Sequence, residues 1–209
     1  MQHQEETLNR VTLRTSIARK AATLAGRLFP GARFTMPADN GSVYLTFDDG
    51  PHPESTPRLL ELLAKHEAKA TFFCLGQNVE QYPGLYEQMI AAGHSIGNHT
   101  WSHPNGWTMS TRRYLADVDR AAGVIESKLF RPPYGRLSPS QYRQLRKKYN
   151  IILWTRQFPD YRPGFNPATT NLAGIRPGDI LVMHDTPATV GRNLPVIERL
   201  LNNIRYAKI

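Results

Sequence analysis

After residue 41 the chain alternates short apolar runs with longer segments in which apolar residues recur every three or four positions. Short apolar runs bounded by glycine or polar residues are typical of buried strands, whereas the longer spacing predicts amphipathic helices. The pattern predicts strands over 43–47, 70–75, 94–98, 151–155 and 179–183, and helices over 57–66, 85–92, 110–127, 138–149 and 194–206. Strands that alternate with helices in this way favour a single α/β domain.

The first 41 residues have a different character and are predicted to form a basic, largely helical extension that precedes a domain over 42–209. Residues 7–38 contain no acidic residue. Apolar residues recur there at helical spacing, at Leu13, Ile17, Leu24 and Leu28. Such a helix either packs its apolar stripe on the domain or lies on a membrane surface, and the first alternative is the commoner one.

Size and composition limit the classes of protein to consider. With 209 residues the chain is long enough for one sizeable core, and a lone cysteine, Cys74, excludes both an intrachain disulfide and a cysteine metal cluster. We expect neither a signal peptide nor a membrane-spanning helix, since no apolar run is long enough. The net charge of +9 suits several anionic partners, but no nucleic-acid-binding module is recognised, so a nucleic-acid partner is not expected.

Polar side chains follow the predicted strands directly, at the edge of a parallel sheet or barrel where active-site groups collect. Asp48 and Asp49 come after the first strand, and we expect their side chains to point to opposite sides and to take different roles. His184 follows the last strand and is a candidate acid for protonating a leaving nitrogen. The alternatives are an Asp-Asp-Gly-Pro turn and a hydrogen-bonded core histidine.

His99 and His103 lie four residues apart, so one helical turn would place both imidazoles on the same side. Together with Asp49 they supply the three protein ligands of an open zinc site. Two solvated or core histidines are the alternative. Residues 131–135, Arg-Pro-Pro-Tyr-Gly, add a cation to a stiff turn in which the amide of Tyr134 can face developing negative charge.

Four motifs in order resemble those of the polysaccharide deacetylases, the metal-dependent sugar N-deacetylases of carbohydrate esterase family four. They are Thr-Phe-Asp-Asp-Gly-Pro at 46–51, His-Thr-Trp-Ser-His at 99–103, Arg-Pro-Pro-Tyr-Gly at 131–135 and Leu-Val-Met-His at 181–184, and the similarity runs from about residue 42 to the C-terminus. The resemblance implies a distorted (β/α) barrel and activity on chitin oligomers, peptidoglycan or related N-acetylated polymers.

The resemblance also implies a role for each matching residue. Asp48 is expected to be the general base, Asp49, His99 and His103 the ligands of one divalent metal ion (zinc, with cobalt or nickel as alternatives), and His184 the general acid. Arg131 would orient Asp48, the Tyr134 amide would stabilise the oxyanion, and Leu181 would line the pocket for the acetyl methyl group.

One further motif of the family matches only in part. The family has two aspartates three apart followed by tryptophan, whereas this chain has Gln157, Asp160 and Tyr161 after Trp154. Asp160 can still tether Arg131 or His184, while Trp154 and Tyr161 are candidates for the sugar-binding wall. These departures leave one alternative function open, an envelope-associated or carbohydrate-binding protein that keeps the fold with little catalysis. The compartment and the oligomeric state stay open.

Overall fold

The computed structural model describes residues 29–38, 41–202 and 206–209, and all structural statements concern these residues. Their strands form one parallel sheet in the order β5-β4-β3-β2-β1-β7-β6, and β8 also pairs with β1. The strands are β1 Val43–Asp48, β2 Thr71–Cys74, β3 Ser95–Asn98, β4 Leu129–Phe130, β5 Asn150–Ile151, β6 Arg156–Gln157, β7 Ile180–His184 and β8 Tyr206–Ala207.

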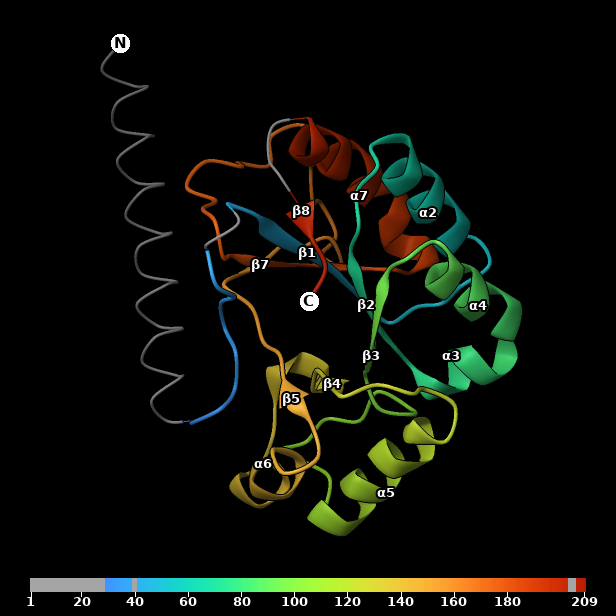
Figure 1. Cartoon of the computed structure of the whole chain (residues 1–209), viewed down its shortest axis with the longest axis vertical. Helices are drawn as coiled ribbons and strands as arrows, with labels where there is room; N and C mark the ends of the chain where they lie inside the picture. Colours follow the sequence, from blue (N-terminus) through green and yellow to red (C-terminus); the bar gives the residue numbers. More distant parts are fainter. Residues whose placement is uncertain (1–28, 39–40, 203–205) are drawn as a thin grey trace.

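The sheet curls into a half-barrel and the helices lie on its outside, which confirms the predicted (β/α) barrel in a single domain (Figure 1). The helices are α2 Thr56–Lys65, α3 Gly76–Gln81, α4 Pro83–Ala91, α5 Thr111–Ala122, α6 Pro139–Leu145 and α7 Pro187–Leu201, with a 3₁₀ turn at Pro133–Gly135. Residues 33–36 run between residues 151–153 and residues 178–179 and hydrogen-bond to both, so they connect the end of β5 to the start of β7.

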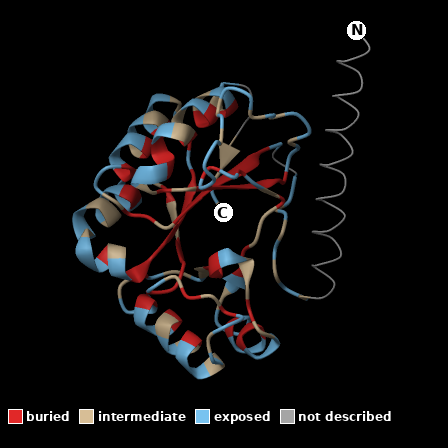
Figure 2. Ribbon diagram, turned by 180° about the vertical axis from the view of Figure 1, so that it is seen from behind, coloured by how far each residue is buried: buried red, intermediate tan, exposed pale blue. Residues whose placement is uncertain are grey.

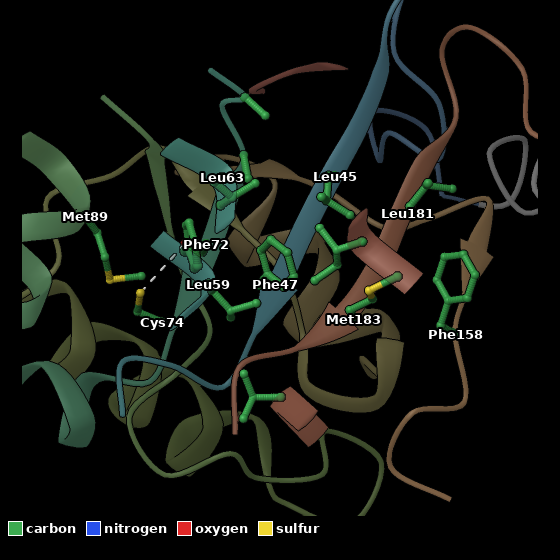
Figure 3. Packing of buried hydrophobic residues seen from close by; sticks show 14 of the residues in the cluster. Leu45, Phe47, Leu59, Leu63, Phe72, Cys74, Met89, Phe158, Leu181 and Met183 are labelled. Carbon is green, nitrogen blue, oxygen red and sulfur yellow. Dashed lines mark hydrogen bonds between the residues drawn. The ribbon is translucent and has the colours of Figure 1, made fainter. Parts of the chain in front are cut away.

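The core lies between the strands and the outer helices (Figure 2). Alternate residues of β1, such as Leu45 and Phe47, pack under α2 and α7, beside Leu181 and Met183 of β7 (Figure 3). Because side chains alternate along a strand, the remaining residues of β1, Thr46 and Asp48 among them, face the inside of the barrel. This alternation turns the polar ends of the strands toward one interior.

Several element boundaries differ from the predictions. Helices α5 and α6 end a turn earlier than expected, and the predicted strand over 151–155 is reduced to its first residue, extended backwards to Asn150. The predicted helix over 194–206 is wrong at both ends, because the Thr186 cap and Pro187 start α7 seven residues earlier and Tyr206–Ala207 pair with β1 instead. Helix α3 was not predicted, since its sequence, Gly-Gln-Asn-Val-Glu-Gln, is short and contains one large apolar residue, which is too few for a helical repeat.

Most of the predicted N-terminal extension, residues 1–28, lies outside the described residues. The end of that segment contacts the domain: the Phe29 ring packs edge-on against Tyr142, whose hydroxyl donates a hydrogen bond to the Pro30 carbonyl over 2.9 Å. None of the helices within the described ranges combines the length and the apolar character needed to cross a bilayer.

Candidate active site

A pocket of about 500 Å³ opens at the carboxyl ends of β1, β3 and β7, where the predicted catalytic residues converge. Parallel strands bring their carboxyl ends to one edge, so residues that are far apart in sequence meet there. The pocket is lined by Asp48, Asp49, His99, His103, Tyr134, Arg136, Trp154, Gln157, Tyr161, His184, Thr186, Ala188 and Thr189.

Asp49, His99 and His103 form a compact cluster in the pocket. The Oδ1 atom of Asp49 lies 3.3 Å from Nε2 of His103 and 3.6 Å from Nε2 of His99. One ligand atom from each residue lies within 4.8 Å of the others, and within the described part of the chain no other His/Cys/Asp/Glu trio is gathered in this way. The cluster is therefore small enough for one ion to reach all three side chains.

Asp49, Thr100 and His103 have left-handed backbone conformations, which bring the cluster together. Because of them, two of the local sequence predictions are wrong. Residues 99–103 form a loop after β3 instead of a helical turn, with φ of 72° at Thr100 and 59° at His103. Asp49 has φ of 80°, which turns its side chain back into the pocket beside Asp48 instead of to the opposite side. Non-glycine residues rarely adopt such angles unless the surrounding structure holds them there.

The loop that carries both histidines is held by side chains that sequence reasoning missed. Asn98 accepts a hydrogen bond from the Thr100 amide over 2.7 Å, and Asp117 of α5 accepts one from the Trp101 amide over 2.7 Å. Asp117 also accepts one from the Ser102 hydroxyl. An Asn two residues before a kinked position is a local turn signal, but nothing local in the sequence points from the loop to Asp117.

The donor set fits a divalent metal ion. Oδ1 of Asp49 is buried and accepts no hydrogen bond from the described residues. The Nδ1 atom of His99 lies 2.7 Å from the Arg131 carbonyl oxygen, so Nδ1 carries the proton and Nε2 offers its lone pair to the cluster. Burial lowers the pKa of His99, outweighing the nearby carboxylates, which keeps the imidazole neutral as a metal ligand requires.

Asp48 forms a buried ion pair with Arg131, whose Nη1 atom lies 2.7 Å from Oδ1 of the carboxylate. Arg131 is fully buried, stacks 4.0 Å from the Phe73 ring centroid and also donates to Thr46 and to two backbone carbonyls. Although burial opposes ionisation, the Arg131 charge, together with His99 and His184, lowers the pKa of Asp48. The carboxylate is thus ionised and fixed in orientation.

His184 is paired with Asp160. Of the two partners expected for the Asp160 carboxylate, Arg131 and His184, the structure places His184 beside it. Nδ1 of His184 lies 2.7 Å from Oδ1 of Asp160, whose Oδ2 accepts from the His184 amide and from Asn193. Burial lowers the pKa of His184, but the hydrogen bond and charge of Asp160, with the charges of Asp48 and Asp49, raise it overall to about 9. The imidazole therefore carries a proton at neutral pH and turns Nε2 toward the pocket.

Aromatic side chains surround the pocket mouth. The Tyr134 ring packs edge-on against His103 at 4.6 Å between centroids, and the Tyr161 ring packs edge-on against His184 at 5.4 Å. Trp154 lies against Gly135, where an added Cβ atom would come within 2.9 Å of the indole. Tyr134 itself has a left-handed φ of 58°, within the 3₁₀ turn Pro133–Gly135.

Residues 35–153 match the sequence model of polysaccharide deacetylases. The chain belongs to this family.

Two relatives with assigned activities are similar over most of the chain. A peptidoglycan-N-acetylglucosamine deacetylase from Bacillus cereus is 34% identical over 74% of the chain and 59% of its own length. A chitooligosaccharide deacetylase from Azorhizobium caulinodans is 35% identical over 74% of the chain and 77% of its own length. The chain thus spans less than two thirds of the Bacillus relative. Among solved structures, the Bc1960 peptidoglycan N-acetylglucosamine deacetylase superimposes with a TM-score of 0.77 at 29% identity, covering 86% of this chain and 91% of its own.

The structure contradicts the expected place of Leu181. Its side chain is fully buried in the core under the outer helices, beside Leu45, and is absent from the pocket lining (Figure 3). Because positions alternate along β7, Val182 shares the inner face with His184. The apolar residue of this strand nearest to His184 on that face is therefore Val182.

Proposed function

We propose that this chain is a divalent-metal-dependent hydrolase that removes N-acetyl groups from N-acetylglucosamine-containing oligo- or polysaccharides. One observation carries the proposal: an ionised carboxylate, a protonated imidazole and an Asp-His-His cluster face one pocket. Amide hydrolysis needs a base, an acid and stabilisation of the developing oxyanion, and these groups can supply all three. The names of the two relatives, which refer to glycan deacetylation, support the same substrate class.

Asp49, His99 and His103 would hold the metal ion. Imidazole with carboxylate suits zinc, and cobalt and nickel are the alternatives. A bound divalent ion supplies Lewis acidity, which polarises the acetamide carbonyl and lowers the pKa of water toward neutrality. The Arg131 carbonyl assists by fixing the His99 ring and its tautomer.

Asp48 is the proposed general base. Its low pKa keeps it ionised at neutral pH, and Arg131 holds one carboxylate oxygen so that the other faces the pocket. Asp48 takes a proton from the attacking water as the oxygen adds to the acetyl carbonyl carbon. The Tyr134 backbone amide then donates to the oxyanion, an interaction worth about 3 kcal/mol per donor in comparable sites.

His184 is the proposed general acid. It gives its Nε2 proton to the departing sugar nitrogen as the carbon–nitrogen bond breaks, which leaves acetate and a free amine. Asp160 positions the ring and keeps it protonated. Trp154 and Tyr161 flank the pocket and are proposed to contact the sugar, and the peptidoglycan or chitin-type chain that carries it is the proposed partner, met at the cell envelope.

The test is acetate release from N-acetylglucosamine oligomers and peptidoglycan after the protein has been stripped of metal and then given zinc or cobalt. We expect release that depends on metal, and we expect His184→Ala to retain the metal and lose most of the turnover. A His184→Ala variant with an unchanged rate would remove the role given to this residue. Saturable binding of sugar without acetate release would favour the alternative function, a carbohydrate-binding protein that retains the fold.

A further inference from the structure

Arg136 presents a guanidinium group at the pocket mouth that the proposed chemistry does not use. It directly follows the 3₁₀ turn that contains Tyr134 and lines the same pocket as the proposed catalytic residues. Its Cζ atom lies 4.6 Å from the centroid of the Trp107 ring and 5.9 Å from that of the Tyr134 ring. Stacking of this kind holds the planar group while its N–H edges stay open to a ligand.

Hydrogen bonds join the loop that contains Trp107 to the segment that follows Arg136. Gln141 donates hydrogen bonds to the carbonyls of Gly106 and Met109 over 2.9 and 3.1 Å, and its Oε1 atom accepts from the Ser138 amide. Gly106 packs so closely on the Arg136 carbonyl that a Cβ atom there would collide with it. Trp107 and Arg136 are therefore held side by side before any ligand arrives, which reduces the entropy lost on binding.

Among the residues that the structure describes, no acidic side chain pairs with Arg136. Over the described residues, no carboxylate lies within 4.0 Å of its side-chain nitrogens. The acidic side chains of the same pocket are engaged elsewhere, Asp48 with Arg131 and Asp49 with the two histidines. Trp107 is 66% exposed, so the ring that supports the guanidinium is itself at the surface. A half-buried cation without a partner, beside a substrate pocket, favours an anionic substituent on the ligand.

We propose that Arg136 is a specificity-determining residue that binds a carboxylate on the sugar next to the one that is deacetylated. The planar fork of arginine matches a carboxylate in a bidentate manner, which a neutral hydroxyl or hydroxymethyl group cannot reproduce. The enzyme then selects glycans with carboxylate-bearing sugars over neutral N-acetylglucosamine chains. This inference rests on the proposed function, because it assigns the pocket to a glycan.

The experiment compares three soluble tetrasaccharides in the metal-loaded protein. The first alternates N-acetylglucosamine with N-acetylmuramic acid and carries free lactyl carboxylates, the second is its methyl ester, and the third is chitotetraose. We expect the wild-type protein to favour the free acid over the ester by about tenfold in kcat/KM, the size of one charge-assisted hydrogen bond. Arg136→Gln should bring that ratio close to one through KM, and it should lower kcat/KM for chitotetraose less than for the free acid.

A matched control is Arg120→Gln, which removes the same charge and a similar stacking contact, 3.7 Å from the Trp101 ring centroid, outside the pocket. It should keep the wild-type ratio. Equal rates for acid and ester in the wild type, or an unchanged ratio in Arg136→Gln, would overturn the inference. Calorimetry of the binding of the acid and the ester to the wild type and to Arg136→Gln tests the role of Arg136 independently of catalysis, even if no tetrasaccharide releases acetate. In that case the proposed function fails while a carboxylate preference lost in Arg136→Gln still supports the role of Arg136.

Discussion

Replacing Asp160 with asparagine tests the proposed acid most sharply, because it removes a charge and keeps an acceptor of the same shape. His184 has its pKa raised to about 9 although burial opposes its charge, and Asp160 provides the hydrogen bond and the nearest negative charge. Without that charge we expect the pKa of His184 to fall to about its ordinary value of 6.5. The difference corresponds to about 3 kcal/mol of stabilisation of the imidazolium.

The loss of activity should therefore depend on pH. At pH 8 a group with a pKa near 9 is about 90% protonated, whereas one with a pKa near 6.5 is about 3% protonated, a difference of roughly 30-fold. At pH 6 both are more than about 70% protonated, so the protonation of His184 should hardly limit the variant and its rate should approach that of the wild type. The alkaline limb of the pH dependence of kcat/KM should move down by about two and a half pH units in Asp160→Asn.

The assay is acetate release from one chitin oligomer between pH 5.5 and 9.5, with metal content measured in each sample. The control is Asp119→Asn, the same substitution at an exposed residue that pairs with Lys148 far from the pocket. An activity loss of equal size at every pH, with the alkaline limb in place, would show that Asp160 acts only by holding the fold. Asp160 would then not control the protonation of His184.

Two further predictions concern stability. Arg131→Met should lower the free energy of unfolding by about 3–5 kcal/mol, since it leaves the buried Asp48 without its partner, and denaturant unfolding with a loss below about 1 kcal/mol would contradict this. Asp185 is buried beside Gly50, accepts a hydrogen bond from Thr56 over 2.6 Å, and has its pKa raised to about 6 by burial. The protonated Asp185 side chain therefore stabilises the fold fully below about pH 4. As the pH rises through about 6 the buried carboxyl ionises, and the free energy of unfolding falls by roughly 3 kcal/mol. Asp185→Asn should show less of this decline in thermal unfolding between pH 4 and 8, and a slope equal to that of the wild type would count against it.

Much of the scaffold can be predicted from the sequence because buried strands appear in it as short apolar runs. The runs that become β1, β2 and β7 are almost wholly apolar, as strands covered by helices require. Polar residues directly after those runs then meet at one edge. This is why the sequence predicts that Asp48, Asp49 and His184 lie near one another.

What escaped prediction depends on contacts between distant segments. The left-handed angles of Asp49 and His103 have no sequence signature of the glycine type, since they are held by their neighbours. Asp117, which anchors the histidine loop, and Asn193, which supports Asp160, lie on helices whose docking the local pattern does not reveal. The face of Leu181 was misjudged because a strand that is buried on both sides shows no alternation of apolar and polar residues.

The most direct test of the central claim is a titration of metal-free protein with zinc, with acetate release from chitotetraose and bound metal measured in the same samples. We expect activity to rise in proportion to bound metal and to saturate at one ion per chain. His99→Ala, which lacks the most buried ligand of the cluster, should gain neither metal nor activity. Acetate release from metal-free protein at the full rate, or a fully loaded protein that releases none, would contradict it.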